Sequence, residues 1–357
     1  MKIVTVVGAR PQFVKAAAVS REIAKNRLIR EVIVHTGQHF DHNMSNIFFE
    51  EMEIPAPQYF LDVNSLDHGA MTGRMLEKIE QVLVAERPDS VVVYGDTNST
   101  LAGALAASKL HVPVVHVEAG LRSFNMSMPE EVNRVLTDRI SSVLCCPTDH
   151  AVENLKREGF EAIGPSIHKT GDVMQDAALY YSQRSAARST IVSRLGLRSG
   201  AYALCTIHRA ENTDHEKSLT EIVEALNAIA QSITVVLPLH PRTRKLLSGL
   251  TATLQFDPIE PVGYFDMLEL LKNSGIVLTD SGGVQKEAFF FSKPCVTLRR
   301  ETEWLELLEA GVNVLAGADR DLIVQSFRTM LDRRPVFDPA LYGSGGASRR
   351  IVEALPS

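Results

Sequence analysis

Residues 90–117, SVVVYGDTNSTLAGALAASKLHVPVVHV, contain two runs of β-branched residues separated by a stretch rich in alanine and leucine. The runs SVVVYG and VPVVHV are almost continuously apolar, which indicates strands buried on both faces. The intervening stretch, 98–110, is long enough for a helix and is rich in residues that favour one. A strand, a helix and a second strand in this order predict a parallel sheet covered by helices.

The same alternation of short apolar runs and longer segments continues on both sides of this stretch. We expect further strands at 2–7, 31–36, 141–146, 202–207, 233–239, 275–280, 294–299 and 313–317, and helices that include 148–158, 216–231 and 319–332. A less regular stretch at 165–200 separates two such series. The sequence therefore predicts two doubly wound, Rossmann-like α/β domains. We place the first at 1–169, completed by the C-terminal helix in 340–357, and the second at 170–339.

The composition excludes several classes of protein. The 357 residues are long enough for two domains, and a net charge of −6 without a long basic block argues against nucleic acid as a partner. The chain has no apolar run near the roughly 20 residues of a membrane helix, and its start does not have the pattern of a signal peptide. Four cysteines without zinc spacing indicate reduced thiols in a cytoplasmic protein: Cys145, Cys146, Cys205 and Cys295.

Polar clusters follow the predicted strands of both domains. Each of eight strands is followed directly by one such cluster: GARPQ, TGQHFD, GDTNST, EAGLR, HRAEN, HPRT, DSGG and RRETE. In open α/β sheets, ligands bind at the carboxyl ends of the strands. We therefore expect the two domains to face one another across a cleft, with these clusters lining a site for a small molecule.

The cluster DSGGVQKE (280–287) opens a helix directly after a strand and is a candidate anion site. Ser281, Gly282 and Gly283 bring backbone N–H groups to the helix N-terminus, where a diphosphate fits. The same residue types are also common helix caps. Glu287, one turn further on, is placed either to accept a ribose hydroxyl or to lie on a solvated helix face.

A second candidate anion site is GARPQFVK (8–15), between the first strand and the helix that follows it. The guanidinium of Arg10 suits a phosphate or carboxylate, and the alternative is a salt bridge at the rim of the domain. Lys15 lies about one turn into the helix. We also expect ligand contacts from Gln38 and His39, which follow the second strand.

Three acids, Asp96, Glu118 and Glu130, come from different loops of the first domain. Carboxylates gathered in one site shift the pKa values of one another, so that one acts as an acid and another as a base. This arrangement suits removal of a proton from carbon together with protonation of a leaving group. Arg134 lies in the same stretch as Glu130 and adds a positive charge for a ligand.

Histidines follow two strands of the second domain. His208 has Arg209 beside it and suits either donation to a phosphate or acid catalysis, and His240 follows the next strand in the same way. His39 and His42 have no third ligand of fixed spacing, so we expect no metal site. A Walker A loop, a dinucleotide-binding GxGxxG and a GxSxG elbow are all absent from the sequence, which disfavours an NTPase, a nicotinamide dehydrogenase and a serine hydrolase.

Seven motifs in order resemble those of the non-hydrolysing UDP-N-acetylglucosamine 2-epimerases: GARPQFVK, GDTNSTLAGALAA, HVEAGLR, MPEEVNR, HRAEN, LHPRT and DSGGVQKEA. The resemblance extends over essentially the whole chain, including YGSGGASRRI near its end. It implies the two-domain fold of the GT-B glycosyltransferases, with UDP in the cleft, and a homodimer. It also implies anti elimination of UDP to a glycal and re-addition on the other face of C2, with neither a nicotinamide nor a metal cofactor.

By this resemblance the site residues divide into two groups. The acid/base group is Asp96, Glu118 and Glu130, while His208 contacts the departing phosphate; which acid removes the C2 proton stays open. Tyr264 lies in EPVGYFDM (260–267), which borders the uracil. The residues expected to contact UDP or the rest of the substrate are Arg10, Lys15, Gln38, His39, Arg134, Arg209, His240, Tyr264, Ser281, Gly282, Gly283 and Glu287.

The chain departs from the commoner family pattern in four places. Gln12 and Lys286 each stand where an acid is usual, the loop at 123–128 is shorter, and RRETEW (299–304) is more aromatic. Two lost acids and one gained base favour a substrate with an extra negative charge. These features resemble the branch that epimerises UDP-2,3-diacetamido-2,3-dideoxy-glucuronate, a precursor of bacterial surface polysaccharide such as lipopolysaccharide O-antigen. UDP-N-acetylglucosamine is the alternative substrate.

Other classes of protein share parts of this pattern. A GT-B glycosyltransferase has the same nucleotide ligands but needs an acceptor and does not exchange the C2 hydrogen with solvent. A hydrolysing epimerase releases free sugar and UDP. A nucleotide-sugar sensor needs the anion site but has no use for Asp96, Glu118 and Glu130, so the presence of all three acids counts against it.

Overall fold

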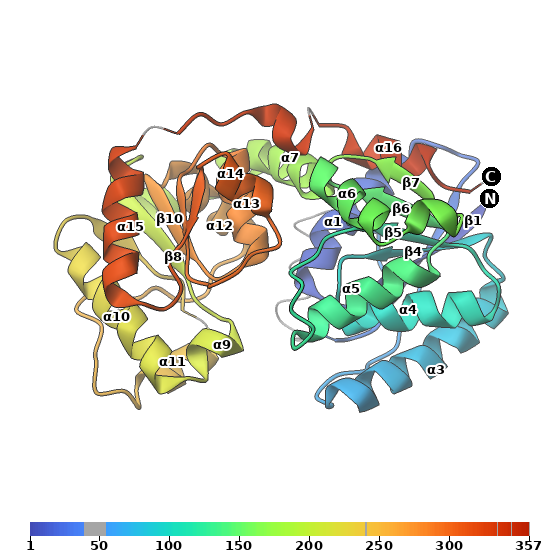
Figure 1. The fold of residues 1–357 in the computed structure, drawn as a ribbon, viewed down its shortest axis with the longest axis horizontal. Helices are drawn as coiled ribbons and strands as arrows, with labels where there is room; N and C mark the ends of the chain where they lie inside the picture. The colour runs from blue at the N-terminus through green and yellow to red at the C-terminus, as the bar shows by residue number, and fades with distance from the viewer. Residues whose placement is uncertain (39–54, 240, 334, 344, 357) are drawn as a thin grey trace. The chain divides into compact units, whose positions relative to one another are not determined.

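The computed structural model describes residues 1–38, 55–239, 241–333, 335–343 and 345–356, apart from the side chain of Arg10. The chain divides into two compact units, each with its own parallel sheet (Figure 1). Unit 1 contains Met1–Ala177 and Pro339–Ser357, and unit 2 contains Ala178–Asp338. Each unit also has its own hydrophobic core.

Unit 1 is built around a parallel sheet that has seven strands among the described residues, in the order β3-β2-β1-β4-β5-β6-β7. The central strands are buried along their length because helices cover both faces of the sheet (Figure 1). Their β-branched side chains fill the core on either side. The strands are β1 (Lys2–Val7), β2 (Arg30–His35), β3 (Tyr59–Phe60), β4 (Ser90–Tyr94), β5 (Val114–Val117), β6 (Val143–Cys146) and β7 (Ser166–Lys169).

The helices of unit 1 connect these parallel strands. Helix α4 packs closely on the sheet: a Cβ added at Gly103 would lie 3.2 Å from side-chain atoms of Val6 and Val93, closer than an ordinary van der Waals contact. The helices are α1 (Arg10–Ile23), α3 (His68–Glu86), α4 (Asn98–Lys109), α5 (Pro129–Ile140), α6 (Asp149–Arg157) and α16 (Ala347–Glu353).

Unit 2 has a five-stranded parallel sheet among its described residues, in the order β12-β11-β10-β8-β9. The strands are β8 (Tyr202–Thr206), β9 (Thr234–Val236), β10 (Ile276–Thr279), β11 (Cys295–Thr297) and β12 (Asn313–Leu315). The helices are α8 (Ile191–Arg194), α9 (Ala210–Thr213), α10 (Glu216–Ala230), α11 (Pro241–Leu247), α12 (Tyr264–Asn273), α13 (Gly282–Phe290), α14 (Leu305–Glu309) and α15 (Arg320–Asp332). Helices α10 and α15 contribute Leu226, Ile229 and Phe327 to the core.

Helix α7 (Val173–Arg188) begins in unit 1 and continues into unit 2, and the C-terminal segment returns to unit 1. Asp176, at the start of α7, accepts hydrogen bonds from the N–H groups of Gly346 and Ser348, both at 2.8 Å. Arg350 of α16 donates to the carbonyl of Thr170 at 2.7 Å. These bonds anchor α16 beside the start of α7, where it packs on α1.

The predicted fold class is confirmed: the chain forms two Rossmann-like α/β units. Ten predicted strands are present, mostly a residue or more shorter than expected. The sequence analysis missed β3 and β7, because β3 has two residues and β7 is an edge strand with largely exposed side chains. No helix of the described residues is long and apolar enough to cross a membrane. All four cysteines are free and buried, and burial raises the pKa of the Cys145 thiol to about 12, so it stays protonated.

Candidate functional site

The predicted polar clusters lie where each sheet reverses its strand order. In unit 1, β1 lies between β2 and β4, and in unit 2, β8 lies between β9 and β10. Open α/β sheets bind ligands at the carboxyl ends of the strands at such a point. GARPQ and GDTNST follow β1 and β4, while HRAEN and DSGG follow β8 and β10. The topology of each unit therefore brings its predicted clusters side by side.

The first loop of unit 1 is held by Gln12. Its carbonyl oxygen accepts from the N–H groups of Gly8 and Ala9 at 2.8 and 2.9 Å, and its amide donates to the Tyr94 carbonyl and the Thr100 hydroxyl at 2.8 and 3.0 Å. The side chain is 1% exposed. Gln12 therefore stabilises the start of α1 and presents nothing to a ligand. These bonds give no support to the interpretation that Gln12 selects a more negative substrate through direct contact.

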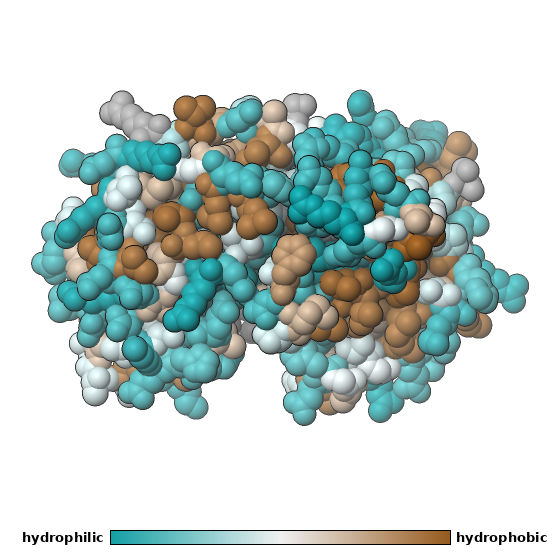
Figure 2. Space-filling view, in the orientation of Figure 1, coloured by the Kyte–Doolittle hydropathy of each residue, from teal (hydrophilic) through white to brown (hydrophobic). Residues whose placement is uncertain are grey.

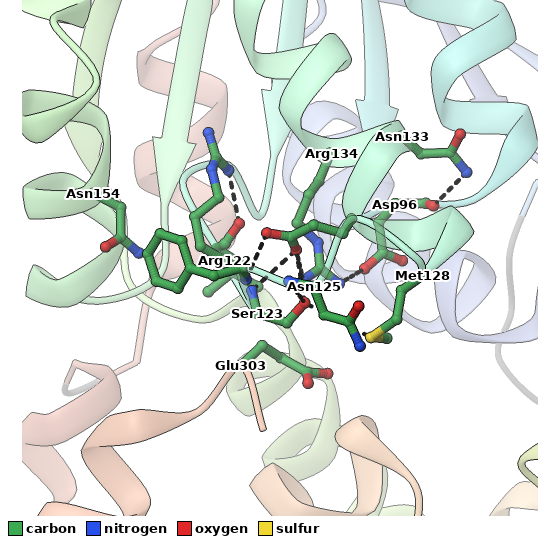
Figure 3. A network of polar contacts seen from close by, with 12 residues as sticks. Asp96, Arg122, Ser123, Asn125, Met128, Asn133, Arg134, Asn154 and Glu303 are labelled. Carbon is green, nitrogen blue, oxygen red and sulfur yellow. Dashed lines mark hydrogen bonds and ion pairs between the residues drawn. The ribbon is translucent and has the colours of Figure 1, made fainter. Parts of the chain in front are cut away.

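Asp96 lies in the turn after β4, where Gly95 has a positive φ of 63°. Its carboxylate contacts the guanidinium of Arg134 from α5, and its carbonyl accepts from the amide of Asn133 at 2.9 Å (Figure 3). The side chain of Arg134 is 4% exposed, whereas that of Asp96 is 31% exposed. A buried cation therefore fixes a carboxylate that reaches the surface of unit 1.

Glu118 lies in the turn after β5 and has φ 73°, an uncommon value for a residue with a side chain. The N–H group of Glu118 donates to the carbonyl of Cys145 at 3.0 Å, which holds this turn, and its carboxylate contacts the ammonium of Lys15 from α1. A Cβ added at Gly95 would lie 3.2 Å from both the Glu118 carboxylate and the Lys15 ammonium. The turns that contain Asp96 and Glu118 are therefore neighbours at the edge of the sheet.

Two adjacent glutamates in the first turn of α5 have different roles. Glu131 is 1% exposed. Its carboxylate accepts from both the N–H and the hydroxyl of Ser123 at 3.0 Å, from the Phe124 N–H at 2.9 Å and from the Arg134 guanidinium at 2.8 Å. Glu130 is only half-buried and has no hydrogen bond or ion pair among the described residues. Successive helical side chains point about 100° apart, so the second glutamate secures the loop and the first faces away from it.

Asp138, near the end of α5, joins three parts of unit 1. It accepts from the N–H of Gly120 at 3.1 Å and from Arg122 at 2.7 Å, and its other oxygen lies 2.6 Å from Nδ1 of His116. Burial alone would raise the pKa of Asp138, but the interactions with His116 and Arg122 lower it below its ordinary value. Helix α5 thus presents Glu131, Arg134 and Asp138 to the turns that contain the predicted acids.

Asp280, directly after β10, has the corresponding place in unit 2. Its carboxylate accepts from the N–H groups of His208 and Arg209, both at 3.0 Å, and from the amide of Asn212 at 3.1 Å. Nδ1 of His208 lies 3.2 Å from the same carboxylate. Burial opposes ionisation of Asp280, yet the bonds from His208 and the two backbone N–H groups lower its pKa. The His208 side chain is itself 55% exposed, so one edge of its ring faces outward.

The N-terminus of α13 has the features of an anion site. The Ser281 hydroxyl accepts from the N–H of Val284 at 3.5 Å and caps the helix. A Cβ added at Gly283 would have only that hydroxyl nearby, at 3.9 Å, so this part of the turn is open. A Cβ added at Gly282 would lie 2.4 Å from the carboxylate of Glu303, so a larger residue there would require the Glu303 side chain to move.

Glu287 and Lys286 lie one turn further along α13, and both are buried. The Tyr264 hydroxyl donates to Glu287 at 3.1 Å, and burial together with Glu287 raises the pKa of Tyr264 well above its ordinary value. Tyr264 therefore acts as a donor that orients Glu287. The Lys286 ammonium lies 4.0 Å from the centre of the Trp304 ring, a cation–π contact.

The remaining predicted residues are placed as follows. Gln38 is half-buried and accepts from the N–H and hydroxyl of Ser99, at 3.1 and 2.7 Å. The Arg209 side chain is half-buried at the N-terminus of α9. His39, His240 and the side chain of Arg10 lie outside the described residues. Within the described ranges, no group of three or more His, Cys, Asp or Glu side chains is placed to hold a metal ion.

Sequence reasoning did not find His116, Glu131 or Asp138. His116 lies inside an apolar run and Asp138 inside an amphipathic helix, where packing is the ordinary interpretation. Helical spacing was the available signal, because residues 131, 134 and 138 are separated by three and four and share one face of α5.

Comparison with known proteins decides the family. The sequence profile described as UDP-N-acetylglucosamine 2-epimerase matches residues 21–356. The chain belongs to this family. The predicted family and its enzyme class, the isomerases, are confirmed.

Individual members of the epimerase family match over nearly the full length. The UDP-2,3-diacetamido-2,3-dideoxy-D-glucuronate 2-epimerase of Pseudomonas aeruginosa PAO1 is 59% identical over 356 residues, covering 99% of each chain. The UDP-GlcNAc 2-epimerase of Methanocaldococcus jannaschii, solved in complex with UDP-GlcNAc and UDP, has a TM-score of 0.90 and 42% identity, covering 99% of each chain. The enzyme from Neisseria meningitidis, bound to UDP-GlcNAc, has a TM-score of 0.87 and 32% identity, again covering 99% of each.

Proposed function

We propose that this epimerase inverts C2 of UDP-2,3-diacetamido-2,3-dideoxy-glucuronate, giving the manno epimer without hydrolysis. The observation that supports this substrate is the 59% identity to the Pseudomonas aeruginosa enzyme that is named for it, over 99% of both chains. Identity to the M. jannaschii UDP-GlcNAc enzyme is 42% over the same share of the chain. The difference of 17 percentage points, 59 minus 42, favours the uronate.

Charge near the anion site gives secondary support. Gln12 is excluded as a contact to the sugar by its burial and its four hydrogen bonds. Lys286 is equally buried and lies over the Trp304 ring, so it adds to the positive potential of this part of unit 2 without reaching the sugar itself. Arg300, in the loop after β11, is exposed, and its positive charge suits a sugar that has a carboxylate at C6 in addition to its diphosphate.

The chemistry of the substrate explains the need for several acids. The C2 hydrogen is not acidic, because no carbonyl group is adjacent to C2. A base removes this proton while the C1–O bond to UDP breaks, which gives a 2-acetamidoglycal and UDP. A proton is then delivered to the other face of C2 as the UDP oxygen returns to C1. All atoms are conserved in these two steps, and no electron carrier is needed.

We assign the proton transfers to Asp96, Glu118 and Glu130. Arg134 and Lys15 hold the first two carboxylates in place, and Glu130 is left half-buried at the start of α5. Fixed groups of this kind need no reorganisation when the charge of the substrate changes. Three carboxyls of unit 1 are then available as the base for one face of C2 and the acid for the other.

We assign the stabilisation of UDP mainly to unit 2. The N–H groups at Ser281, Gly282 and Gly283 and the outward edge of His208 are donors for the departing diphosphate. Glu287, oriented by Tyr264, accepts a ribose hydroxyl. The proposed contacts to the substrate are completed by the remaining predicted residues: Arg10, Gln38, His39, Arg209 and His240. Donors that bind the diphosphate more strongly as its charge develops make UDP a better leaving group.

UDP-N-acetylglucosamine is the second candidate substrate. The observation that favours it is the TM-score of 0.90 to the M. jannaschii enzyme, whose structure contains UDP-GlcNAc and UDP. The same acids and the same UDP contacts serve either substrate, since both have an acetamido group at C2.

Proton NMR in D2O tests the reaction itself. Purified enzyme and the diacetamido-uronate should give loss of the C2 proton signal by deuteration, appearance of the manno epimer, and no net release of UDP. Asp96→Asn should stop the exchange, while Glu153→Gln, at an exposed site on α6, should behave as wild type. Free sugar with stoichiometric UDP would show a hydrolase, and binding without exchange would show a sensor or a transferase.

We further propose a homodimer that functions in the cytoplasm in the synthesis of a surface polysaccharide. Apolar side chains gather over α4 and α5 in unit 1 (Figure 2), and Leu136 of α5 is 47% exposed. Burial of such a face between two copies is favourable. Light scattering should give twice the chain mass for wild type, and Leu136→Glu should shift the distribution toward monomer.

A further inference from the structure

A buried histidine lies directly beneath the proposed acids of unit 1. His116 of β5 is 0% exposed, and its two ring nitrogens face two oxygen atoms. Nε2 lies 2.7 Å from the carbonyl oxygen of Gly95, and Nδ1 lies 2.6 Å from Oδ1 of Asp138. Gly95 immediately precedes Asp96, so the ring touches the turn that holds one proposed catalytic acid.

The hydrogen-bonding groups around the ring limit its protonation. A carbonyl oxygen can only accept, so Nε2 must have a proton in order to bond Gly95. The other oxygen of Asp138 accepts from the Gly120 N–H at 3.1 Å and from the Arg122 guanidinium at 2.7 Å, which is the environment of an ionised carboxylate. An ionised Asp138 also accepts from Nδ1, which then needs a second proton.

The charged groups around the ring come from two neighbouring elements. Arg122 bridges Asp138 to Glu158, which it contacts at 2.7 and 2.8 Å. The Glu158 side chain is 30% exposed, so water screens its charge, and the protonation of the ring follows from the hydrogen-bonding groups. Cys146 of β6 is a further titratable group that interacts with Asp138, and burial raises the pKa of its thiol well above the ordinary value, so it adds no charge.

We propose that His116 is held as an imidazolium and acts as a positioning residue for the proposed epimerisation. Through Nε2 it fixes the Gly95–Asp96 turn. Through Asp138 it fixes Gly120 and so the turn that contains Glu118. One doubly protonated ring therefore sets the spacing between two acids that reach C2 of the substrate. The charge state stands on geometry alone, while the positioning role rests on the proposed function.

A second buried histidine in the same sheet is an internal control. His35 of β2 is 1% exposed, and its Nδ1 accepts from the Gly37 N–H at 2.9 Å. A backbone N–H can only donate, so this ring nitrogen has no proton and the ring is neutral. Burial lowers the pKa of His35 to about 4. The two histidines should therefore differ in charge in one spectrum of one protein.

Nitrogen NMR of the wild-type enzyme labelled at histidine tests the charge state. His116→Gln and His35→Gln assign the two signals. In the folded enzyme both ring nitrogens of His116 should be protonated, whereas His35 should show one protonated nitrogen. A single protonated nitrogen at His116 would place the shared proton on Asp138 or reverse the pair, and would overturn the proposal. The charge state itself is measured on the wild-type enzyme, and the two variants serve only for assignment.

Kinetics of His116→Gln tests the positioning role. Glutamine can still donate to Gly95 but cannot donate to Asp138 as well, so the two turns lose their link. We expect kcat for C2 deuteration to fall by about 100-fold, with KM and the Kd for UDP within twofold of wild type and an altered pH profile. Thr137→Val, a buried change beside Asp138 on α5, should leave all of these values unchanged.

The outcomes separate this inference from the proposed function. Wild-type rates in His116→Gln would overturn the positioning role. If the wild-type enzyme itself exchanged no C2 hydrogen, the proposed function would fail, and the positioning role with it. The nitrogen spectrum would still decide the charge state of His116.

Discussion

Each unit contains a histidine paired with a buried aspartate at the carboxyl edge of its sheet, and the two pairs differ in exposure. In unit 1, His116 and Asp138 are both 0% exposed. In unit 2, Asp280 is 0% exposed but the His208 side chain is 55% exposed. Both aspartates also accept backbone N–H groups from the adjoining turn, from Gly120 in the first case and from His208 and Arg209 in the second.

The difference in exposure gives the histidine–aspartate pair a different role in each unit. A sealed histidine has both nitrogens committed to the protein, so it is able only to place other groups. An open histidine has one edge left for a ligand, while its aspartate fixes the ring. This comparison predicts that loss of a buried charge in unit 1 lowers the stability of the protein. In unit 2, loss of the open histidine lowers the affinity for UDP.

The largest predicted effect is on stability, in Asp138→Asn compared with Asp280→Asn. Loss of the Asp138 charge leaves Arg122 and a cationic His116 buried without their shared anion, which should cost about 3–5 kcal/mol. Asp280 serves neutral donors and an exposed ring, so its loss should cost about 1–3 kcal/mol. Urea unfolding of both variants measures the difference. Equal losses would mean that the pairs do not differ as described.

A second prediction concerns pH and the neutral His35. Its folded pKa of about 4 lies below the unfolded value of roughly 6.5, so the unfolded state binds the proton more readily. The free energy of unfolding should fall by up to about 3 kcal/mol as pH drops from 6.5 to 4. His35→Gln should remove this part of the slope, as followed by urea unfolding across that range. A slope unchanged by His35→Gln would contradict this prediction.

The third prediction is a loss of UDP affinity in His208→Gln. A charge-assisted hydrogen bond to phosphate contributes roughly 1.5–3 kcal/mol, so the Kd should rise about 10- to 100-fold. Calorimetric titration with UDP measures this directly. His116→Gln, the sealed counterpart, should bind UDP as wild type does. A weaker Kd in both variants would remove the distinction between open and sealed histidines.

The smallest predicted effect compares two helix caps, one in each unit. Thr97 caps α4 and Ser281 caps α13, each through its hydroxyl. Alanine at either position should reduce stability by about 1 kcal/mol. Only Ser281→Ala should also weaken UDP binding, because α13 alone is proposed to meet the diphosphate. Thermal unfolding and UDP titration of the two variants give a matched pair of measurements.

Much of the fold followed from local patterns. The buried strands appeared as apolar runs, and the polar clusters after them marked the carboxyl edges where the topology places Asp96, Glu118 and Asp280. The short, exposed β7 had no such run and was missed. Secondary structure with both faces buried is therefore easier to predict than an edge strand.

The site residues were harder to predict than the fold, because the direction in which a side chain points matters more than its position in the sequence. Gln12 lies in a loop that the pattern assigned to ligand binding, yet its side chain turns back into the protein. Glu130 and Glu131 are adjacent in sequence and differ in exposure because of the helical rotation between them. His116 looked like a packing residue because its partners, Gly95 and Asp138, are distant in the chain.

A competition experiment tests the central claim most directly. The enzyme is placed in D2O with equal concentrations of UDP-2,3-diacetamido-2,3-dideoxy-glucuronate and UDP-N-acetylglucosamine, and proton NMR follows deuteration at C2 of each. We predict that the uronate alone is deuterated and converted to its epimer. Deuteration of UDP-N-acetylglucosamine in preference to the uronate would contradict the account.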